Sequence, residues 1–274
     1  MIASRRFRWS TVVLSVLAGI WLYPVVWTLT NAVRSSADIY RAPWDVPWPP
    51  AIGNIGEAWS RGQLGVAMAN SAFVTAMTVV VVLALAIPGA YALTRLRPPA
   101  RAVLFLLVLA PLIIPTEVLI VPTFSIFRAL GLINSLPGLS LTDAVASVSF
   151  STVILAGYFR TIPQDVVDAA RVDGAGRLDV LLRIVIPLAR PGILAVALLV
   201  AVFTWNDFGG ALVLLQKPEV FTAQLALTRF STLYATDQGL TFAGMAIVIL
   251  PPLLLFLVLQ RSFIQGLTAG VVRR

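Results

Sequence analysis

Residues 62–94 read GQLGVAMANSAFVTAMTVVVVLALAIPGAYALT and contain no charged side chain. A helix of about 20 apolar residues crosses the hydrocarbon core of a bilayer, so this run is long enough to span a membrane. Backbone amides inside lipid must pair within their own segment, which makes a helix the expected form. The stretch therefore predicts a membrane-spanning helix.

Other apolar stretches of the chain have the same character. Hydrophobic residues make up 59% of the 274 residues and charged residues only 12%, whereas soluble proteins carry about 25% charged residues. The sequence predicts an all-α polytopic membrane protein with a single transmembrane domain over residues 1–274. The six predicted spans are approximately 10–33, 68–94, 102–127, 139–160, 189–214 and 240–261.

The basic residues are distributed unevenly between the connecting segments. With a cytoplasmic N-terminus, 14 of the 20 Lys and Arg residues lie on the cytoplasmic side, as the positive-inside rule favours. The other six are Arg34, Arg41, Arg61, Arg128, Lys217 and Arg229. We therefore expect a multi-pass protein of the cytoplasmic membrane with both termini in the cytoplasm. The net charge of +8 is a topology signal, and its scattered basic residues do not predict nucleic-acid binding.

Cysteine and histidine are absent from the sequence. Their absence excludes disulfides, metal sites built on Cys or His, and catalysis by either residue. No GxxxxGKS or GxxxxGKT phosphate-binding loop occurs either. We expect no catalytic residue, no metal site and no cofactor bound by this chain.

The segment 161–188 concentrates charge between two apolar spans. Thr161 and Gln164 have the spacing of a capping box around Pro163, which predicts the start of a helix. Gly174 is expected to end that helix, and a second short helix is predicted from Arg177 to Ile186. Two helices this short need a surface to pack on. A charged connector lying on lipid headgroups is the simpler alternative.

The order of residues in this segment resembles the EAA loop of ABC importer permeases. Asp168-Ala169-Ala170 stands in the place of Glu-Ala-Ala, Gly174 supplies the glycine, and Pro187-Leu188 closes the pattern. Aspartate keeps the charge of the family's glutamate on a shorter side chain. The stretches LGLINS, WNDF and QGLTAG are similar to the maltose-type (MalG-like) carbohydrate permeases, and this similarity extends over nearly the whole chain.

The resemblance implies a type I ABC importer permease fold in which the loop is a cytoplasmic coupling helix that docks on an ATPase. It also implies a second related permease, two ABC ATPases that bind ATP and Mg, an extracytoplasmic solute-binding protein, and surrounding membrane lipid. The expected ATPase-coupling residues are Asp165, Asp168, Ala169, Ala170, Arg171, Asp173, Gly174, Ala175, Leu181 and Pro187.

Polar side chains inside the predicted spans are candidates for the substrate pathway, because ionisable groups in a membrane are costly and often functional. These candidates are Glu117, Asp143, Ser147, Trp205, Asn206 and Asp207. All of them except Asp143 have a structural alternative: Glu117 as a polar residue at a proline kink, Asn206 and Asp207 as partners of a helix break, Ser147 as a small packing residue and Trp205 as core filler.

The resemblance further implies that the last outer loop contacts the binding protein, through Thr222, Gln224, Arg229 and Tyr234. An ordinary exposed loop remains the alternative. The expected function is import of a sugar or sugar-derived solute by alternating access. Two alternatives are an ABC permease for a polyol, glycerophosphate or amino acid, and an ion-coupled secondary transporter, which usually shows inverted repeats and more midplane charges.

Overall fold

The computed structural model describes residues 2–42, 44–46, 48–231 and 236–268, except for the side chains of residues 2–8, 116, 117 and 261–268. Its regular structure is helical apart from an isolated bridge between Ser231 and Thr236. The chain forms two compact units. Unit 1 comprises Met1–Gly65 and Ala226–Leu250, and unit 2 comprises Val66–Leu225 and Pro251–Arg274.

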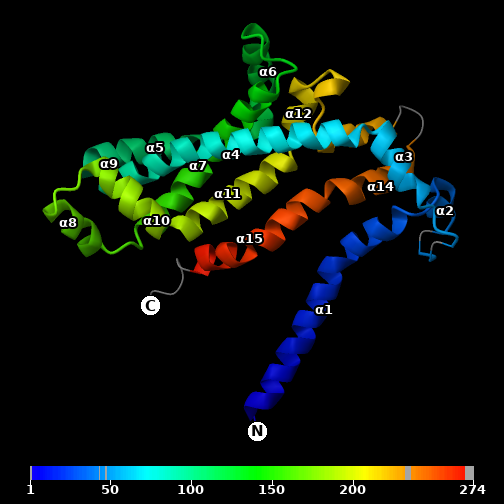
Figure 1. The fold of residues 1–274 in the computed structure, drawn as a ribbon, viewed down its shortest axis with the longest axis horizontal. Coiled ribbons are helices and arrows are strands. Elements are labelled where there is room, and N and C mark those ends of the chain that lie inside the picture. Colours follow the sequence, from blue (N-terminus) through cyan, green and yellow to red (C-terminus); the bar gives the residue numbers. More distant parts are fainter. Residues whose placement is uncertain (1, 43, 47, 232–235, 269–274) are drawn as a thin grey trace. The chain divides into compact units, whose positions relative to one another are not determined.

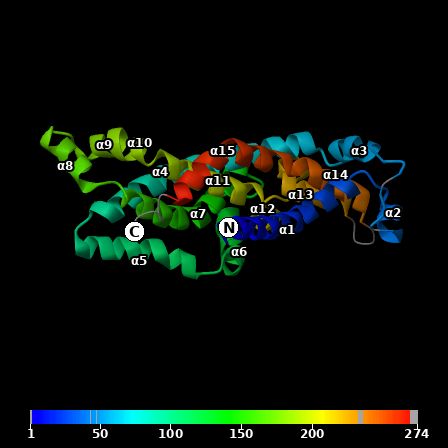
Figure 2. The same cartoon turned by 90° about the horizontal axis from the view of Figure 1, so that it is seen from below.

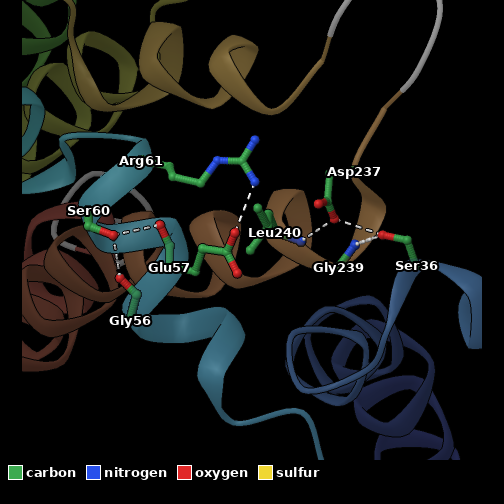
Figure 3. Close-up of polar contacts among 8 residues, drawn as sticks. All are labelled: Ser36, Gly56, Glu57, Ser60, Arg61, Asp237, Gly239 and Leu240. Atoms are coloured by element: carbon green, nitrogen blue, oxygen red, sulfur yellow. Dashed lines mark hydrogen bonds and ion pairs between the residues drawn. The ribbon is translucent and has the colours of Figure 1, made fainter.

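Unit 1 is built around α14 (Gln238–Val248), which packs on α1 (Ile2–Asn31), α2 (Ser36–Arg41) and α3 (Gly53–Arg61). Asp237 caps α14 by accepting a hydrogen bond from the amide of Leu240 at 3.1 Å. Ser36 donates to the same carboxylate oxygen of Asp237 at 2.7 Å and accepts from the amide of Gly239 at 3.0 Å (Figure 3). The start of α2 is therefore fixed to the start of α14.

Unit 2 contains most of α4 (Leu64–Arg95), then α5 (Pro98–Ile113), α6 (Ile120–Ala129), α7 (Leu136–Phe159) and α11 (Arg190–Trp205) (Figure 1). One hydrophobic core joins α4, α7 and α11, with Phe159 and Leu155 among its buried side chains. Small residues allow these helices to approach closely, since a methyl group on Gly89 of α4 would lie 3.3 Å from Thr152 of α7.

Shorter elements complete unit 2. They are α8 (Gln164–Val172), α9 (Arg177–Val180), a π-helical turn (Leu181–Val185), α10 (Ile186–Leu188), α12 (Gly209–Leu214), α13 (Ala223–Ala226), whose last residue belongs to unit 1, and α15 (Leu250–Thr268). Single 3₁₀ turns lie at Thr116–Leu119, Pro218–Val220 and Leu227–Phe230, the last of these in unit 1.

Four helical stretches among the described residues are long and apolar enough to cross a membrane: Trp9–Asn31, Leu64–Arg95, Leu136–Phe159 and Gln238–Gln260. A fifth candidate is the bent pair Arg177–Leu188 and Arg190–Trp205, whose axes differ by 77°. The predicted spans 10–33, 68–94, 139–160 and 240–261 correspond to the first four. Exposed apolar side chains cover α1 from Trp9 to Leu29, as expected of a helix that faces lipid or another apolar partner.

The predicted spans 102–127 and 189–214 are each divided rather than continuous. In the first, α5 ends at Ile113, Ile114 is extended with φ −89° and ψ 119°, and α6 begins only at Ile120. Pro115 explains the break, because proline disfavours the helical conformation of the residue before it. In the second, α11 ends at Trp205, and α12 follows after the interruption at 206–208.

Candidate functional site

The charged segment between α7 and α11 forms the expected pair of short helices, but its first helix begins differently from the prediction. Thr161 does not cap α8, because its hydroxyl donates to the carbonyl of Tyr158 at 2.8 Å. Pro163 occupies the N-cap position without a side-chain bond, and Gln164 donates to Asp168 rather than back toward Thr161. The predicted capping box is therefore wrong, although the helix lies where the sequence placed it.

Gly174 ends α8 as predicted. Its φ of +88° is a left-handed conformation that glycine adopts without steric cost. The amide of Ala175 donates to the carbonyl of Ala170 at 2.9 Å, and that of Gly174 donates to Arg171 at 3.0 Å. These two bonds are the Schellman pattern of a helix C-terminus. Ala170 and Ala175 also pack against the core of unit 2, so the small residues of the motif both form the turn and hold it against the core.

The second half of the segment contains a widened helical turn. The amide of Ile186 donates to the carbonyl of Leu181, five residues back. Pro187 explains the widening, because it has no amide to continue the ordinary helical ladder. The chain then bends at Ala189, which is fully buried, and enters α11. The predicted helix over 177–186 thus forms, with a π turn inside it.

One face of the segment is anchored in unit 2. Val167 of α8 and Val180 of α9 are fully buried in the core shared with α4, α7 and α11. Leu181 lies in the same core with 8% of its surface exposed. Of the predicted coupling residues, Leu181 therefore supports the segment from inside instead of belonging to its exposed face.

The opposite face is open to solvent in this chain. Its exposed residues include the predicted Asp165, Asp168, Ala169, Arg171, Asp173, Gly174 and Pro187. Exposed apolar side chains lie among them, and the most exposed are Val172 at 88% and Leu178 at 65%. Arg171 pairs with Asp168 at 3.2 Å, and Arg183 pairs with Asp179 at 3.4 Å. Exposed pairs of this kind contribute about 0–1 kcal/mol to folding stability, so their main effect is on the charge pattern of the surface.

Two adjoining cavities in unit 2 bring together several predicted pathway residues. Their volumes are about 330 Å³ and about 690 Å³, and Asp143 and Asp207 line both. Ser147 and Asn206 line the larger cavity, together with Phe203 and Phe208. In the described part of the chain, the Oδ2 atom of Asp143 is buried without a hydrogen-bond partner. Asp143 is therefore the carboxylate of this site that is free to bind something else.

Asp207 and Asn206 have structural partners of their own. Asp207 accepts hydrogen bonds from the amides of Gly210 at 3.1 Å and Ala211 at 3.0 Å, and so holds the start of α12. Asn206 accepts from the side-chain amide of Gln224 at 2.9 Å. The predicted alternative, that these residues hold a helix break, agrees with these contacts, and both still line the larger cavity.

Other predicted residues lie elsewhere. Trp205 is 7% exposed and lines a separate apolar cavity of about 510 Å³ between α4, α11 and α15, so it is not part of the polar site. Thr222 is 4% exposed, which excludes it from an open contact surface of this chain. Arg229 donates to the carbonyl of Gly62 at 2.6 Å within unit 1. Tyr234 and the side chain of Glu117 lie outside the described residues.

Sequence reasoning missed several asparagines that organise loops. Asn134 has a φ of 59°, and its Oδ1 accepts from the amides of Gln216 at 2.6 Å and Lys217 at 2.9 Å. Asn70 donates to two backbone carbonyls of the 219–221 turn. The tolerance of asparagine for left-handed backbone was the available signal at Asn134, whereas nothing in the sequence pointed to Asn70. No group of three or more acidic side chains suited to a metal ion occurs in the described part of the chain.

Comparison with known proteins covers most of the chain. A sequence model described as "Binding-protein-dependent transport system inner membrane component" matches residues 64–268. The chain is 32% identical over 274 residues to the diacetylchitobiose uptake system permease protein NgcG of Streptomyces coelicolor, covering 99% of this chain and 91% of that protein. It is 30% identical over 271 residues to the melibiose/raffinose/stachyose import permease protein MelC of Bacillus subtilis, covering 98% of each.

A solved structure is similar as well. It is a chain from the crystal structure of a bacterial ABC transporter involved in the import of the acidic polysaccharide alginate. The TM-score is 0.79 at 26% sequence identity, and the superposition covers 93% of this chain and 95% of that chain.

Proposed function

Because the chain belongs to the family of binding-protein-dependent transport system inner membrane components, we propose that it is the permease subunit of an ATP-driven importer that carries a sugar or sugar-derived solute across the cytoplasmic membrane. Its spans alternate between inward-open and outward-open arrangements. Energy comes from hydrolysis of the ATP that partner ATPase subunits bind together with Mg, and this chain transmits the resulting movement.

The observation that carries the proposal is the two-faced segment from α8 to α10. Val167 and Val180 are fully buried in unit 2, whereas Val172 is 88% exposed and Leu178 65% exposed. Exposed apolar side chains ringed by Asp and Arg are typical of a protein-binding surface. In the topology with both termini in the cytoplasm, this surface faces the cytoplasm and receives an ABC ATPase.

The remaining partners belong to the same proposal. A second, related permease subunit completes the pathway, because the exposed apolar helices of this chain require partners or lipid. Two ATPase copies bind the two permeases, one through the α8–α10 segment of this chain. An extracytoplasmic binding protein delivers the solute on the opposite side. Thr222 is buried and Arg229 is bonded to the carbonyl of Gly62, so this docking uses other residues of the outer loops.

The polar cavities support a sugar as the solute. Carboxylate and amide oxygens of Asp143 and Asn206 accept hydrogen bonds from hydroxyl groups, and Phe203 and Phe208 offer apolar faces to the C–H surface of a sugar ring. The relatives NgcG and MelC are named for the uptake of diacetylchitobiose and of melibiose, raffinose and stachyose. We propose an oligosaccharide of this size class as the cargo.

Two measurements test the proposal. The tagged chain should co-purify with an ABC ATPase and a second permease, and a stand-alone active protein would contradict the importer. The reconstituted complex, supplied with its binding protein, should then accumulate at least one labelled sugar from a panel of diacetylchitobiose, melibiose, raffinose and trehalose in an ATP-dependent manner. Uptake of an amino acid or glycerophosphate, with none of the sugars, would refute the sugar assignment but leave the importer intact.

A further inference from the structure

The last residue of α4 contacts the first residue of α8. The guanidinium group of Arg95 donates from Nη1 to the Oε1 atom of Gln164. Gln164 in turn donates through Nε2 to the Oδ1 atom of Asp168 at 2.9 Å, and Arg171 donates to the same oxygen at 3.2 Å. Figures 1 and 2 both place α8 and α9 at the end of unit 2 where α4 passes into α5. Side-chain hydrogen bonds therefore join α4 to the exposed face of α8.

The other end of α4 holds the turn that follows α12. Asn70 donates through Nδ2 to the carbonyls of Glu219 and Phe221, both at 3.0 Å. The hydroxyl of Ser71 accepts from the amide of Ala223 at 2.8 Å. The segment 219–223 is thus bonded directly to the first turns of α4.

Between these contacts α4 is one continuous helix. Asn70 and Arg95 are separated by 25 residues, which corresponds to roughly 38 Å of helix. Its middle is fixed in the core, and the Oγ1 atom of Thr78 donates to the carbonyl of Ser140 on α7 at 3.3 Å. The core residues of α4 are Val82, Ala86, Ala90 and Leu93, all at most 1% exposed. This buried face packs α4 against its neighbours in unit 2, so a displacement at one end is passed along the helix although Pro88 lies within it.

We propose that α4 is the mechanical link of this permease, and that Arg95 and Asn70 are the positioning residues at its two ends. A displacement of α8 by the ATPase pulls on Arg95, moves α4, and displaces the 219–223 segment through Asn70. This inference rests on the proposed function, which places the ATPase at α8 and the 219–223 segment on the opposite side of the membrane. It assigns to Arg95 and Asn70 a role that no sequence motif indicated.

A purely supporting role for these contacts predicts a different result. In that case, removal of the Arg95 or Asn70 contact lowers the stability and the yield of the complex. In the complexes that still assemble, both ends of α4 respond equally to the ATPase. If α4 is a link, loss of either contact should leave a complex that assembles and hydrolyses ATP, but movement at α8 should no longer reach residue 219. The test must therefore measure movement at the far end of α4.

The absence of cysteine from the native chain allows a single spin label to be placed by Glu219→Cys. The side chain of Glu219 is exposed, and its backbone carbonyl accepts the bond from Asn70, so the substitution keeps that contact. The labelled chain is assembled with cysteine-free partner subunits in proteoliposomes. Its electron paramagnetic resonance spectrum is recorded without nucleotide and after trapping with ATP and vanadate.

With native Arg95, trapping should change the mobility of the label. Arg95→Met should reduce this response at least about fivefold, the lower range of ordinary allosteric coupling, while the basal ATPase rate stays unchanged. Arg95→Lys should keep most of the response, because an ammonium group still donates to Gln164. Arg97→Met is the matched control, because Arg97 is exposed and lies two residues beyond the end of α4. It should leave the response intact.

Asn70→Ala tests the same link from the end far from the ATPase, and it should abolish the response even if Arg95→Met fails to assemble. A response that stays at the native size in both Arg95→Met and Asn70→Ala would overturn the inference. So would a chain with native Arg95 and Asn70 that carries a bound ATPase and shows no response at residue 219. Failure of any ATPase to bind the native chain would instead refute the proposed function.

Discussion

The aromatic ring of Tyr158 on α7 lies directly against the backbone of Gly192 on α11, so that a methyl group built on Gly192 would be 2.6 Å from the Cγ atom of Tyr158. The two helices leave the α8–α10 segment at its opposite ends, and this contact fixes their separation. The Cγ atom is only two bonds from the Cα atom of Tyr158, so the ring cannot move away from Gly192 without a shift of the α7 backbone.

Gly192→Ala should therefore destabilise the protein by about 1–3 kcal/mol, the usual cost of overpacking a core. Thermal unfolding in detergent measures the effect. Gly157→Ala is the matched control on α7, because a methyl group there meets nothing within 4 Å; it should be neutral or stabilise by up to about 1 kcal/mol. Equal melting temperatures for the two variants would show that α7 and α11 can separate without cost.

Asp237→Ala should destabilise unit 1 by about 0.5–2 kcal/mol, because it removes the cap of α14 and the bond from Ser36. Asp237→Asn keeps an acceptor oxygen and should therefore lower the stability by less than Asp237→Ala does. Glu57→Ala serves as the control, since its pair with Arg61 is exposed on both sides (Figure 3) and is worth less than about 0.5 kcal/mol. Protease resistance of the outer loops and thermal unfolding both report the difference.

Asp143→Ala should raise the apparent KM for the transported sugar by about twofold to tenfold, because a typical hydrogen bond contributes about 0.5–1.5 kcal/mol. Asp143→Asn keeps an acceptor and should lie between the native chain and Asp143→Ala. Initial uptake rates over a range of sugar concentrations give the values. Val145→Ala is the control on the same helix, since Val145 is 69% exposed and outside the cavity lining. Unchanged uptake by Asp143→Ala would remove this residue from the pathway.

Val172→Asp should weaken ATPase binding roughly tenfold or more, because a new charge in the middle of an interface costs at least about 1.4 kcal/mol. The side chain is 88% exposed in the isolated chain, so folding and membrane insertion should be unaffected. Val46→Asp changes a comparably exposed valine in unit 1 and should leave ATPase binding unchanged. Pull-down of the ATPase against a concentration series distinguishes them, and equal affinities would show that Val172 lies outside the interface.

The sequence located most of the long helices and the charged segment correctly, because both depend on local patterns. Charge-free runs mark spans wherever lipid is the solvent, and Gly174 could be read as a helix stop from its position alone. The break at Pro115 was less visible: proline is tolerated in many membrane helices, so only the extended conformation of Ile114 shows that the helix stops there.

Contacts between distant segments were the part that the sequence did not reveal. Trp205 and Thr222 were interpreted as pathway and docking residues, but neighbours contributed by other helices bury both. Thr161 had the spacing of a cap, yet the carbonyl of Tyr158 competes for its hydroxyl. Gln164 looked like part of the same cap and instead binds Arg95, which lies 69 positions earlier.

Pro187 gives the junction before α11 a property that packing alone would not supply. The proline removes an amide from the helical ladder, the turn ahead of it widens, and the chain then changes direction by 77° around the buried Ala189. The bend therefore has a local cause in the sequence, the missing amide of Pro187, in addition to the burial of Ala189 in the core of unit 2.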